Sequence, residues 1–392
     1  MKVVVAHNRY RSDAPSGENI MVDLESAQLA AAGVEVVRFQ RDSDDIPALP
    51  ATQKALLPLS PIWSPASTRA LADLLRRERP DVLHLHNPYP LLSPGVVRTA
   101  HRFGIPVVQT VHNYRQVCAP GLYFRDGHVC TDCKGKAFAL PAIQHRCYRG
   151  SAAQSAIMAT TLAVHRGTWR SVDRYIALTE NIAAHLRDYG IPPERIAIKP
   201  NAVEDPGPPT PPGSGVLFAG RLSTEKGLGV LLDAWKRSTP GALGRLRIAG
   251  DGELRPLAEA AAAERPDVEY VGPQDRAGVR ELMRAAALVT VPSTWFEPLS
   301  TVIIEALANG RPVLGTAMGG SPFLIDSAGW VVAPNADALA EALPLAVKEA
   351  ASLAAVARER YLSTFHPDVV TSRLIEIYSS VVGSRPKDRQ LG

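Results

Sequence analysis

The run Gly215-Val-Leu-Phe-Ala219 is continuously apolar and is followed at once by the turn Gly220-Arg-Leu-Ser-Thr-Glu-Lys-Gly227. Similar apolar runs follow at residues 246–249, 268–271, 288–291, 312–314 and 330–332, with stretches of helical spacing between them. Strands that are apolar on both faces and alternate with helices are typical of a parallel sheet covered on both sides. This half of the chain therefore predicts a doubly wound α/β domain.

The first half of the chain repeats this alternation. Its apolar runs lie at residues 2–6, 34–39, 81–85, 105–111, 174–178 and 196–198, and helical spacing covers residues 20–32, 67–77 and 93–103. Between the halves, residues 205–213 contain five prolines, which exclude a helix or a central strand and predict a semi-rigid linker. We therefore expect domains at 1–204 and 214–364, with a final helix in 365–392 that crosses back to the first domain. Ligands of such sheets bind beyond the carboxyl ends of the strands, so we expect a site in a cleft between the two domains.

Composition excludes several classes of protein. The 392 residues carry a net charge of +4, without the concentrated basic stripe that nucleic-acid binding requires. No apolar run reaches the roughly 18 residues of a membrane span, and the first residues predict a strand rather than a signal peptide. The arginines of residues 68–79 are interpreted as a solvated helix face, so peripheral membrane contact is not supported. We expect a cytoplasmic protein.

Charged residues follow the predicted strand ends of the second half. Arg221 and Lys226 can neutralise phosphate oxygens, and a helix that begins near Leu299 presents free N–H groups to an anion. Glu297 and Glu305 are two helical turns apart and can accept hydrogen bonds from sugar and ribose hydroxyls. Each feature alone is typical of a solvated loop or surface. Together, in this order, they indicate binding of a nucleotide diphosphate.

The segments Gly220-Arg-Leu-x-x-Glu-Lys-Gly227, Gly250-Asp-Gly252 and Glu297-Pro-x6-Glu305-Ala resemble the retaining GT-B glycosyltransferases of family 4. The resemblance implies two Rossmann-like domains that face each other across a cleft. It implies that Arg221, Lys226 and Glu297 are catalytic. Relatives have Phe-Gly where this chain has Leu299-Ser300, which affects the fit of the donor sugar. The implied donor-binding residues are Gly17, Gly220, Arg221, Lys226, Gly250, Glu297, Leu299, Ser300, Thr301 and Glu305.

The same resemblance assigns acceptor binding to the first domain. Ser16-Gly-Glu-Asn19 resembles a glycine-rich loop of the family, with Ser16 in place of the first glycine. His112, at a predicted strand end, matches a family histidine that lies beside the transferred sugar, and we count it among the catalytic candidates. The expected acceptor-binding residues are Glu18, Asn19, His86, Asn87, His112 and Asn113.

All four cysteines, Cys118, Cys130, Cys133 and Cys147, lie in residues 112–150, which we interpret as an insertion. Four thiolates can hold a structural zinc ion, and a similar insertion occurs in a bacterial subset of the family. Reduced thiols or one disulfide are the alternatives, and His128 or His145 can substitute as a ligand. Catalysis in this family needs no metal.

These observations predict a retaining enzyme of hexosyltransferase type. It would move a sugar from a nucleotide diphosphate sugar to a hydroxyl acceptor such as a surface glycan, a glycolipid or a natural product. A nucleotide-sugar 2-epimerase and a non-catalytic nucleotide-sugar binding protein share the architecture and stay open as alternatives. The sequence leaves open the acceptor, the donor base and sugar, the linkage and the oligomeric state.

Overall fold

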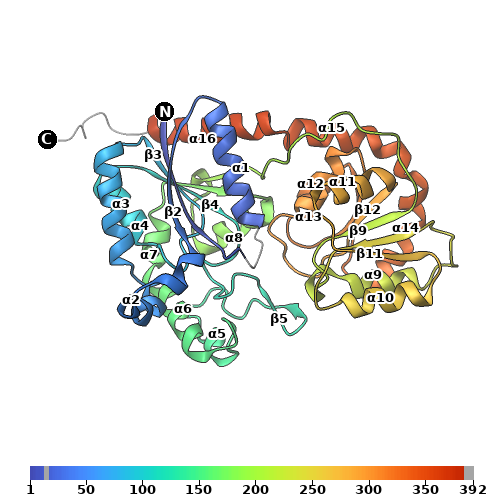
Figure 1. Cartoon of the computed structure of the whole chain (residues 1–392), viewed down its shortest axis with the longest axis horizontal. Coiled ribbons are helices and arrows are strands. Elements are labelled where there is room, and N and C mark those ends of the chain that lie inside the picture. Colours follow the sequence, from blue (N-terminus) through green and yellow to red (C-terminus); the bar gives the residue numbers. More distant parts are fainter. Residues whose placement is uncertain (13–16, 384–392) are drawn as a thin grey trace. The chain divides into compact units, whose positions relative to one another are not determined.

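The computed structural model describes residues 1–12 and 17–383, and it divides the chain into two compact units. Unit 1 contains residues 1–122, 131–202 and the end of the chain from Val370, and unit 2 contains residues 123–130 and 203–369. Each unit is built on a six-stranded parallel sheet (Figure 1). This confirms the two doubly wound α/β folds that the apolar runs predict.

The sheet of unit 1 has the strand order β2-β1-β3-β4-β7-β8. Its strands are β1 (Lys2–Arg9), β2 (Glu35–Asp42), β3 (Val82–Leu85), β4 (Val107–Val111), β7 (Arg174–Ala177) and β8 (Ile196–Ile198). The helices of this part of the chain are α1 (Gly17–Ala31), α2 (Ala51–Leu56), α3 (Pro65–Glu78), α4 (Gly95–Arg102), α5 (Leu140–Gln144), α6 (Ala152–Val164), α7 (Arg166–Arg170) and α8 (Glu180–Tyr189).

One face of this sheet is covered by α1 and by the carboxy-terminal helix α16 (Pro367–Gly383). Val3 and Val5 of β1 contribute to the same buried cluster as Leu29 of α1 and Leu374 of α16. Successive strand residues point to opposite faces, so Val4 contributes to the other face, and all of these strand side chains are at most 1% exposed. The end of the chain therefore completes the core of unit 1.

The sheet of unit 2 has the order β11-β10-β9-β12-β13-β14. Its strands are β9 (Val216–Ala219), β10 (Leu246–Ala249), β11 (Val268–Gly272), β12 (Leu288–Val291), β13 (Val313–Thr316) and β14 (Gly329–Val332). The helices are α9 (Leu228–Trp235), α10 (Arg255–Glu264), α11 (Arg276–Ala285), α12 (Thr301–Ala308), α13 (Ser321–Ile325), α14 (Ala336–Glu349) and α15 (Ala354–Thr364). A short hairpin, β5 (Phe124–Arg125) with β6 (His128–Val129), groups with this unit.

Two buried clusters enclose the second sheet. Val216 and Phe218 face α9, α10 and α14, whereas Leu217 and Ala219 face α11, α12, α13 and α15. This alternation along β9 explains why the run is apolar at every position: both faces of the strand are inside the protein. Within the described residues, no helix is both long enough and apolar enough to span a membrane.

Candidate functional site

The strand order of unit 2 places two predicted loops next to each other. Chain progression across the sheet reverses between β9 and β12, which are neighbours. In open α/β sheets, ligands bind beyond the carboxyl ends of the strands at such a switch point. The loops that follow β9 and β12 carry Lys226 and Glu297, so the topology brings these two candidates to the position where a ligand is expected.

Lys226 and Glu297 are in direct contact. The Lys226 Nζ atom forms an ion pair with Glu297 Oε1, and Ser293 Oγ donates to Glu297 Oε2 at 2.9 Å. The Lys226 ammonium also lies 5.9 Å from the centre of the Trp295 ring. The Glu297 side chain is 7% exposed and that of Lys226 is 21% exposed, so the pair is largely shielded from water. A shielded cation at this point can bind a phosphate group strongly.

Glycines allow the backbones around this pair to approach closely. At Gly227, which has φ of +78°, an added Cβ would lie 1.9 Å from the carbonyl oxygen of Pro292. At Gly319 it would lie 2.2 Å from the oxygen of Glu297. Gly220 and Gly250, two of the predicted donor-binding residues, also approach each other closely. A Cβ added to Gly250 would lie 1.9 Å from the carbonyl oxygen of Gly220. These glycines fix the loops that carry the charged side chains.

The other predicted donor residues surround α12 or lie on the surface. Arg221 is 64% exposed and pairs with Glu225 at 2.7 Å, so its guanidinium is available at the surface. Ser300 precedes α12 in extended backbone, with φ of −95°, so the position does not require glycine. Thr301 begins α12, and Leu299 packs partly against the core of this face.

Glu305 is the predicted ribose ligand and lies inside α12. Its carboxylate forms no hydrogen bond or ion pair with any other residue in 1–12 or 17–383. Burial raises the pKa of the Glu305 carboxyl, partly offset by Arg276 and Arg280 of α11. A half-buried carboxylate with no protein partner is suited to accept hydrogen bonds from a ligand.

Unit 1 has its own switch point, between β1 and β3, where three histidines gather. His7 of β1, His84 of β3 and His86 after β3 are each no more than 4% exposed. The rings of His84 and His86 are 4.2 Å apart, and His86 Nδ1 lies 2.9 Å from Nε2 of His112, which follows β4. Burial, followed by the neighbouring His86, lowers the pKa of His7 to about 4. The predicted acceptor residues His86 and His112 are therefore brought together.

A cavity that opens to solvent adjoins these histidines. Tyr89, Gln109 and Arg115 line it, and each has a buried polar side-chain atom without a hydrogen-bond partner among residues 1–12 and 17–383. The cavity is lined in addition by Glu18, His86, Asn87, His112, Asn113 and several further residues. A cavity with convergent polar groups is suited to a polar small molecule.

Two of the predicted acceptor-binding residues, Asn87 and Asn113, form hydrogen bonds with the backbone of the turns around the cavity. The Asn87 amide donates to the carbonyls of Asn8 and Tyr89, and its oxygen accepts from the Tyr89 N–H. Asn113 accepts from the Arg115 N–H at 3.1 Å. These side chains shape the turns after β3 and β4.

The loop after β1 contributes further predicted residues. Asn19 Oδ1 lies 2.9 Å from His7 Nε2, and the Tyr10 hydroxyl donates to Glu18 at 3.2 Å. Gly17 begins α1 and is exposed, with open space where a Cβ would stand. Ser16 lies outside the described residues.

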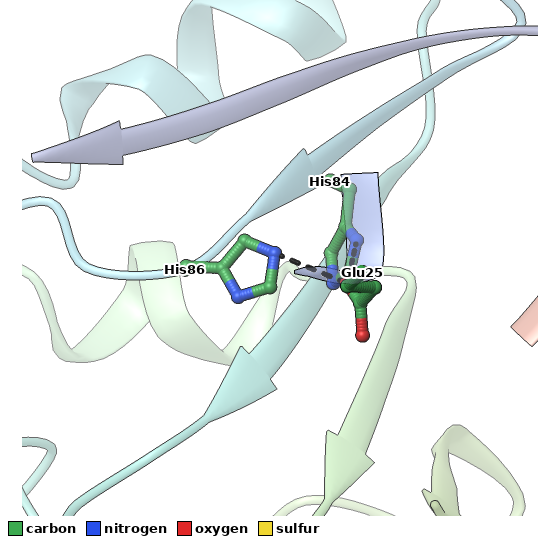
Figure 2. Close-up of side chains that lie close together, drawn as sticks. All are labelled: Glu25, His84 and His86. Atoms are coloured by element: carbon green, nitrogen blue, oxygen red, sulfur yellow. Dashed lines mark ion pairs between the residues drawn. The ribbon is translucent and has the colours of Figure 1, made fainter. Parts of the chain in front are cut away.

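One possible set of metal ligands occurs, and it is not the predicted one. The possible ligands are Glu25, His84 and His86 (Figure 2), whose ligand atoms all lie within 4.8 Å of one another. In residues 1–12 and 17–383, no other group of three or more histidine, cysteine or acidic side chains is arranged in this way. None of the four cysteines belongs to such a group, and each is half-buried. Their placement therefore does not support the predicted zinc site.

Sequence reasoning missed Glu25, Lys199 and Arg115. Lys199 Nζ lies 2.6 Å from Glu25 Oε2, and the Lys199 side chain is 1% exposed. Lys199 directly follows the apolar run of β8, where a lysine is unusual. This position was the sequence feature that could have indicated a buried, paired lysine. Nothing local in the sequence marks Glu25 as its partner.

With this geometry established, comparison with known families assigns the class. Residues 213–348 match the family described as "Glycosyl transferases group 1", and residues 16–202 match "Glycosyl transferase 4-like domain". Through these two matched halves, the chain belongs to the glycosyltransferases of this type.

Individual relatives agree with this assignment. The chain is 31% identical to a glycosyltransferase of Methanocaldococcus jannaschii over 32% of its own length and 33% of the relative. It is 30% identical to the D-inositol 3-phosphate glycosyltransferase of Mycobacterium bovis, over 45% of its own length and 39% of the relative. The matches thus span well under half of these relatives.

Solved structures match over almost the whole chain. Sucrose-phosphate synthase from Thermosynechococcus elongatus superposes with a TM-score of 0.69 and 19% identity, covering 98% of this chain and all of that one. HepE of Anabaena, solved in complex with UDP, superposes with a TM-score of 0.64 and 17% identity, covering 97% of this chain and 100% of that chain. At this level of identity, the likeness shows the GT-B fold.

Proposed function

We propose that this protein is a retaining hexosyltransferase that transfers a sugar from a nucleotide diphosphate sugar to a hydroxyl acceptor. The observation that carries the proposal is the arrangement at the switch point of unit 2. There, a shielded lysine and a buried carboxylate meet where two loops follow neighbouring strands. Glu305 lies on the helix that follows one of these loops, and its carboxylate has no hydrogen-bond or ion-pair partner in the described part of the chain.

In this proposal Lys226 and Arg221 bind the donor diphosphate, Glu305 binds the ribose hydroxyls and Glu297 contacts the sugar near its reacting carbon. The acceptor oxygen forms a bond to the anomeric carbon while the bond from that carbon to the phosphate oxygen breaks. The diphosphate leaves with the electron pair and takes the acceptor proton on the same face, so the configuration is retained. The protein contributes by positioning the reactants and by stabilising the leaving charge.

The substrates follow from the class of site. UDP is the first nucleotide to test, because HepE of Anabaena was solved with it. The cavity of unit 1, with its unpartnered Tyr89, Gln109 and Arg115 atoms, is the proposed place for a polar acceptor. We propose that the protein binds both substrates, the nucleotide sugar and the acceptor, in the cytoplasm.

The experiment that tests this function measures nucleotide release. The full chain is incubated with a panel of nucleotide diphosphate sugars, with and without a panel of sugar, polyol and glycolipid acceptors. We expect release of nucleoside diphosphate that depends on an acceptor, and a glycoside with the anomeric configuration of the donor. Conversion of the sugar without an acceptor would indicate a 2-epimerase instead, and binding without turnover would indicate a binding protein.

Replacing Glu305 by glutamine is expected to weaken nucleotide binding about 10- to 100-fold, because a hydrogen bond to a charged group contributes roughly 1.5–3 kcal/mol. Calorimetric titration with the donor found in the panel measures the change. Glu259→Gln is the matched control, since Glu259 is an exposed carboxylate paired with Arg255 on α10. Equal affinities for Glu305→Gln and wild type would remove the ribose assignment.

A structural zinc at Cys118, Cys130, Cys133 and Cys147 is retained as a proposal from their spacing alone. Protein purified without added metal is then expected to hold one zinc per chain, which elemental analysis measures. Because the ligating thiolates must be deprotonated, acid or a chelator should release the metal. Substoichiometric zinc together with four thiols that react freely would reject this proposal.

A further inference from the structure

The helix α6 of unit 1 has an apolar face that is open to solvent. Its 13 residues include no charged residue, and its inner face buries Met158 and Leu162. A helix at a protein surface normally has charged or polar residues on the side away from the core. In α6, the residues at helical spacing on the outer side are instead Ala153, Ile157, Thr160 and Val164, and none of them is buried.

Neighbouring segments extend this apolar surface. α5 and the short 3₁₀ helix η2 (Leu57–Leu59), which directly follows α2, both contact α6. His165, at the end of α6, also donates from Nε2 to the Ile62 carbonyl at 2.6 Å. Figure 1 shows α2, α5 and α6 gathered in the same part of unit 1. The large apolar side chains that are at least 40% exposed on and beside these segments are Leu56, Leu59, Trp63, Phe138, Leu140 and Val164.

We call these six side chains, together with the outer face of α6, the α6 surface. Single exposed apolar side chains are common on proteins, whereas a group of them on adjacent elements is typical of a surface that binds something. α2 strengthens this interpretation, because none of its residues is buried. The segment from α2 to η2 therefore adds little to the core of unit 1 and places its leucines in water.

The charges of the segments that form the α6 surface all have one sign. Residues 46–68 and 133–172 contain seven lysines and arginines and no aspartate or glutamate. The rest of the chain has 36 basic and 39 acidic residues, so the net positive charge of the protein comes from these two segments. Lys136, Arg146 and Arg149, next to α5, are exposed and form no ion pair with any other residue in 1–12 or 17–383.

Exposed apolar side chains with unpaired cations beside them fit the surface of an anionic lipid bilayer. The apolar groups can enter the boundary between headgroups and acyl chains, and lysines and arginines near the bilayer are attracted by its negative surface potential. Protein interfaces, in contrast, usually combine an apolar centre with charges of both signs that pair across the contact. The two segments that form the α6 surface supply no acidic residue for such pairing.

We propose that the α6 surface binds this protein to an anionic lipid bilayer. Its exposed apolar side chains enter the headgroup boundary, and Lys136, Arg146 and Arg149 contact lipid phosphate groups. The binding is peripheral, since no helix of the described residues can span a membrane. The α6 surface does not include the arginines of residues 68–79, which stay a solvated helix face. The inference concerns this surface alone and does not depend on the reaction proposed above.

Co-sedimentation of the full chain with lipid vesicles tests the proposal. One set of vesicles contains phosphatidylglycerol and phosphatidylcholine in equal parts, and the other contains phosphatidylcholine alone. We expect the protein to sediment with the anionic vesicles, much less with the neutral ones, and less as salt is added, because salt screens the attraction. Absence of binding to both kinds of vesicle, or equal binding to both, would overturn the proposal.

A variant without the exposed leucines tests which surface is used. Leu56→Ser, Leu59→Ser and Leu140→Ser together are expected to weaken binding to the anionic vesicles at least about 10-fold, because less apolar area leaves water. All three side chains are more than half exposed, so the variant should fold, which circular dichroism checks. The matched control replaces three leucines of unit 2 that are 37–47% exposed, Leu257, Leu345 and Leu362, and should bind like wild type. Equal loss in both variants would contradict the assignment to the α6 surface.

A second variant tests the cations. Lys136→Gln, Arg146→Gln and Arg149→Gln together should weaken binding roughly 100-fold, since each charge near an anionic bilayer contributes about a factor of five. The control makes the same change in net charge on unit 2, at the exposed residues Lys236, Arg237 and Arg245. Sedimentation velocity without lipid gives the remaining comparison. A dimer that the leucine variant abolishes, in a protein that binds no vesicles, would show that the α6 surface binds a second copy of the chain and would refute the proposal.

Discussion

Replacing Lys226 by alanine is expected to slow sugar transfer roughly 30- to 1,000-fold. Lys226 is the more shielded of the two predicted phosphate ligands, with 21% of its side chain exposed against 64% for Arg221. Loss of a preorganised charge beside a departing diphosphate raises the barrier by about 2–4 kcal/mol. Arg221→Ala should have a smaller effect, because its guanidinium is solvated and already pairs with Glu225.

The measurement is the initial rate of nucleoside diphosphate release at saturating donor and acceptor. Lys236→Ala is the control, since Lys236 is half-exposed on the surface and lies 3.8 Å from Glu264. Urea unfolding of Lys226→Ala must accompany the rates, because the variant leaves the buried Glu297 with Ser293 as its hydrogen-bond donor. Wild-type turnover in both Lys226→Ala and Arg221→Ala would show that the diphosphate is bound elsewhere.

Replacing Arg311 by methionine is expected to lower the free energy of unfolding by about 3–5 kcal/mol. Arg311 is fully buried in unit 2. Its guanidinium donates to the backbone carbonyls of Met283, Thr210, Pro211 and Arg284 at 2.9–3.1 Å. Methionine has a similar length but no donor, so each of these carbonyls would lose its hydrogen bond to the guanidinium. The Met283 carbonyl keeps a second partner, the Ala286 N–H, and a buried carbonyl that finds no other partner costs roughly 1–3 kcal/mol.

Urea denaturation, followed by fluorescence and circular dichroism, measures this loss. The control is Arg237→Ala, which removes an exposed ion pair with Asp337 and is expected to cost less than about 1 kcal/mol. If Arg311→Met were as stable as this control, the carbonyl contacts would contribute nothing to the fold. The same contacts hold residues 210–211 of the proline-rich segment, which composition alone predicts as a linker.

Much of the fold was predictable because its signal is local. β9 reads as a strand in the sequence since both of its faces are buried, and the glycines after it mark where the chain turns. The candidate donor-binding residues could be predicted for the same reason, because Lys226 and Glu297 each follow an apolar run in the sequence. Strand order then brought them together, as expected for residues at the carboxyl ends of neighbouring strands.

The contacts among buried polar groups in unit 1 were not predictable in this way. Glu25 and Lys199 are 174 positions apart, and their pairing depends on how α1 packs against the strand ends. Tyr378, which contacts His84, comes from the last helix, 294 positions further along. The cysteines show the opposite case, because their proximity in the sequence predicted a cluster that the placement of their side chains does not support.

The central claim is that the loops after β9 and β12 bind a nucleotide diphosphate sugar. Hydrogen exchange of the full chain, with and without a saturating nucleotide diphosphate sugar, tests it most directly, because bound backbone exchanges more slowly. We predict that ligand slows exchange in residues 220–227 and 292–305. Unchanged exchange in both segments, with protection confined to other parts of the chain, would contradict the claim.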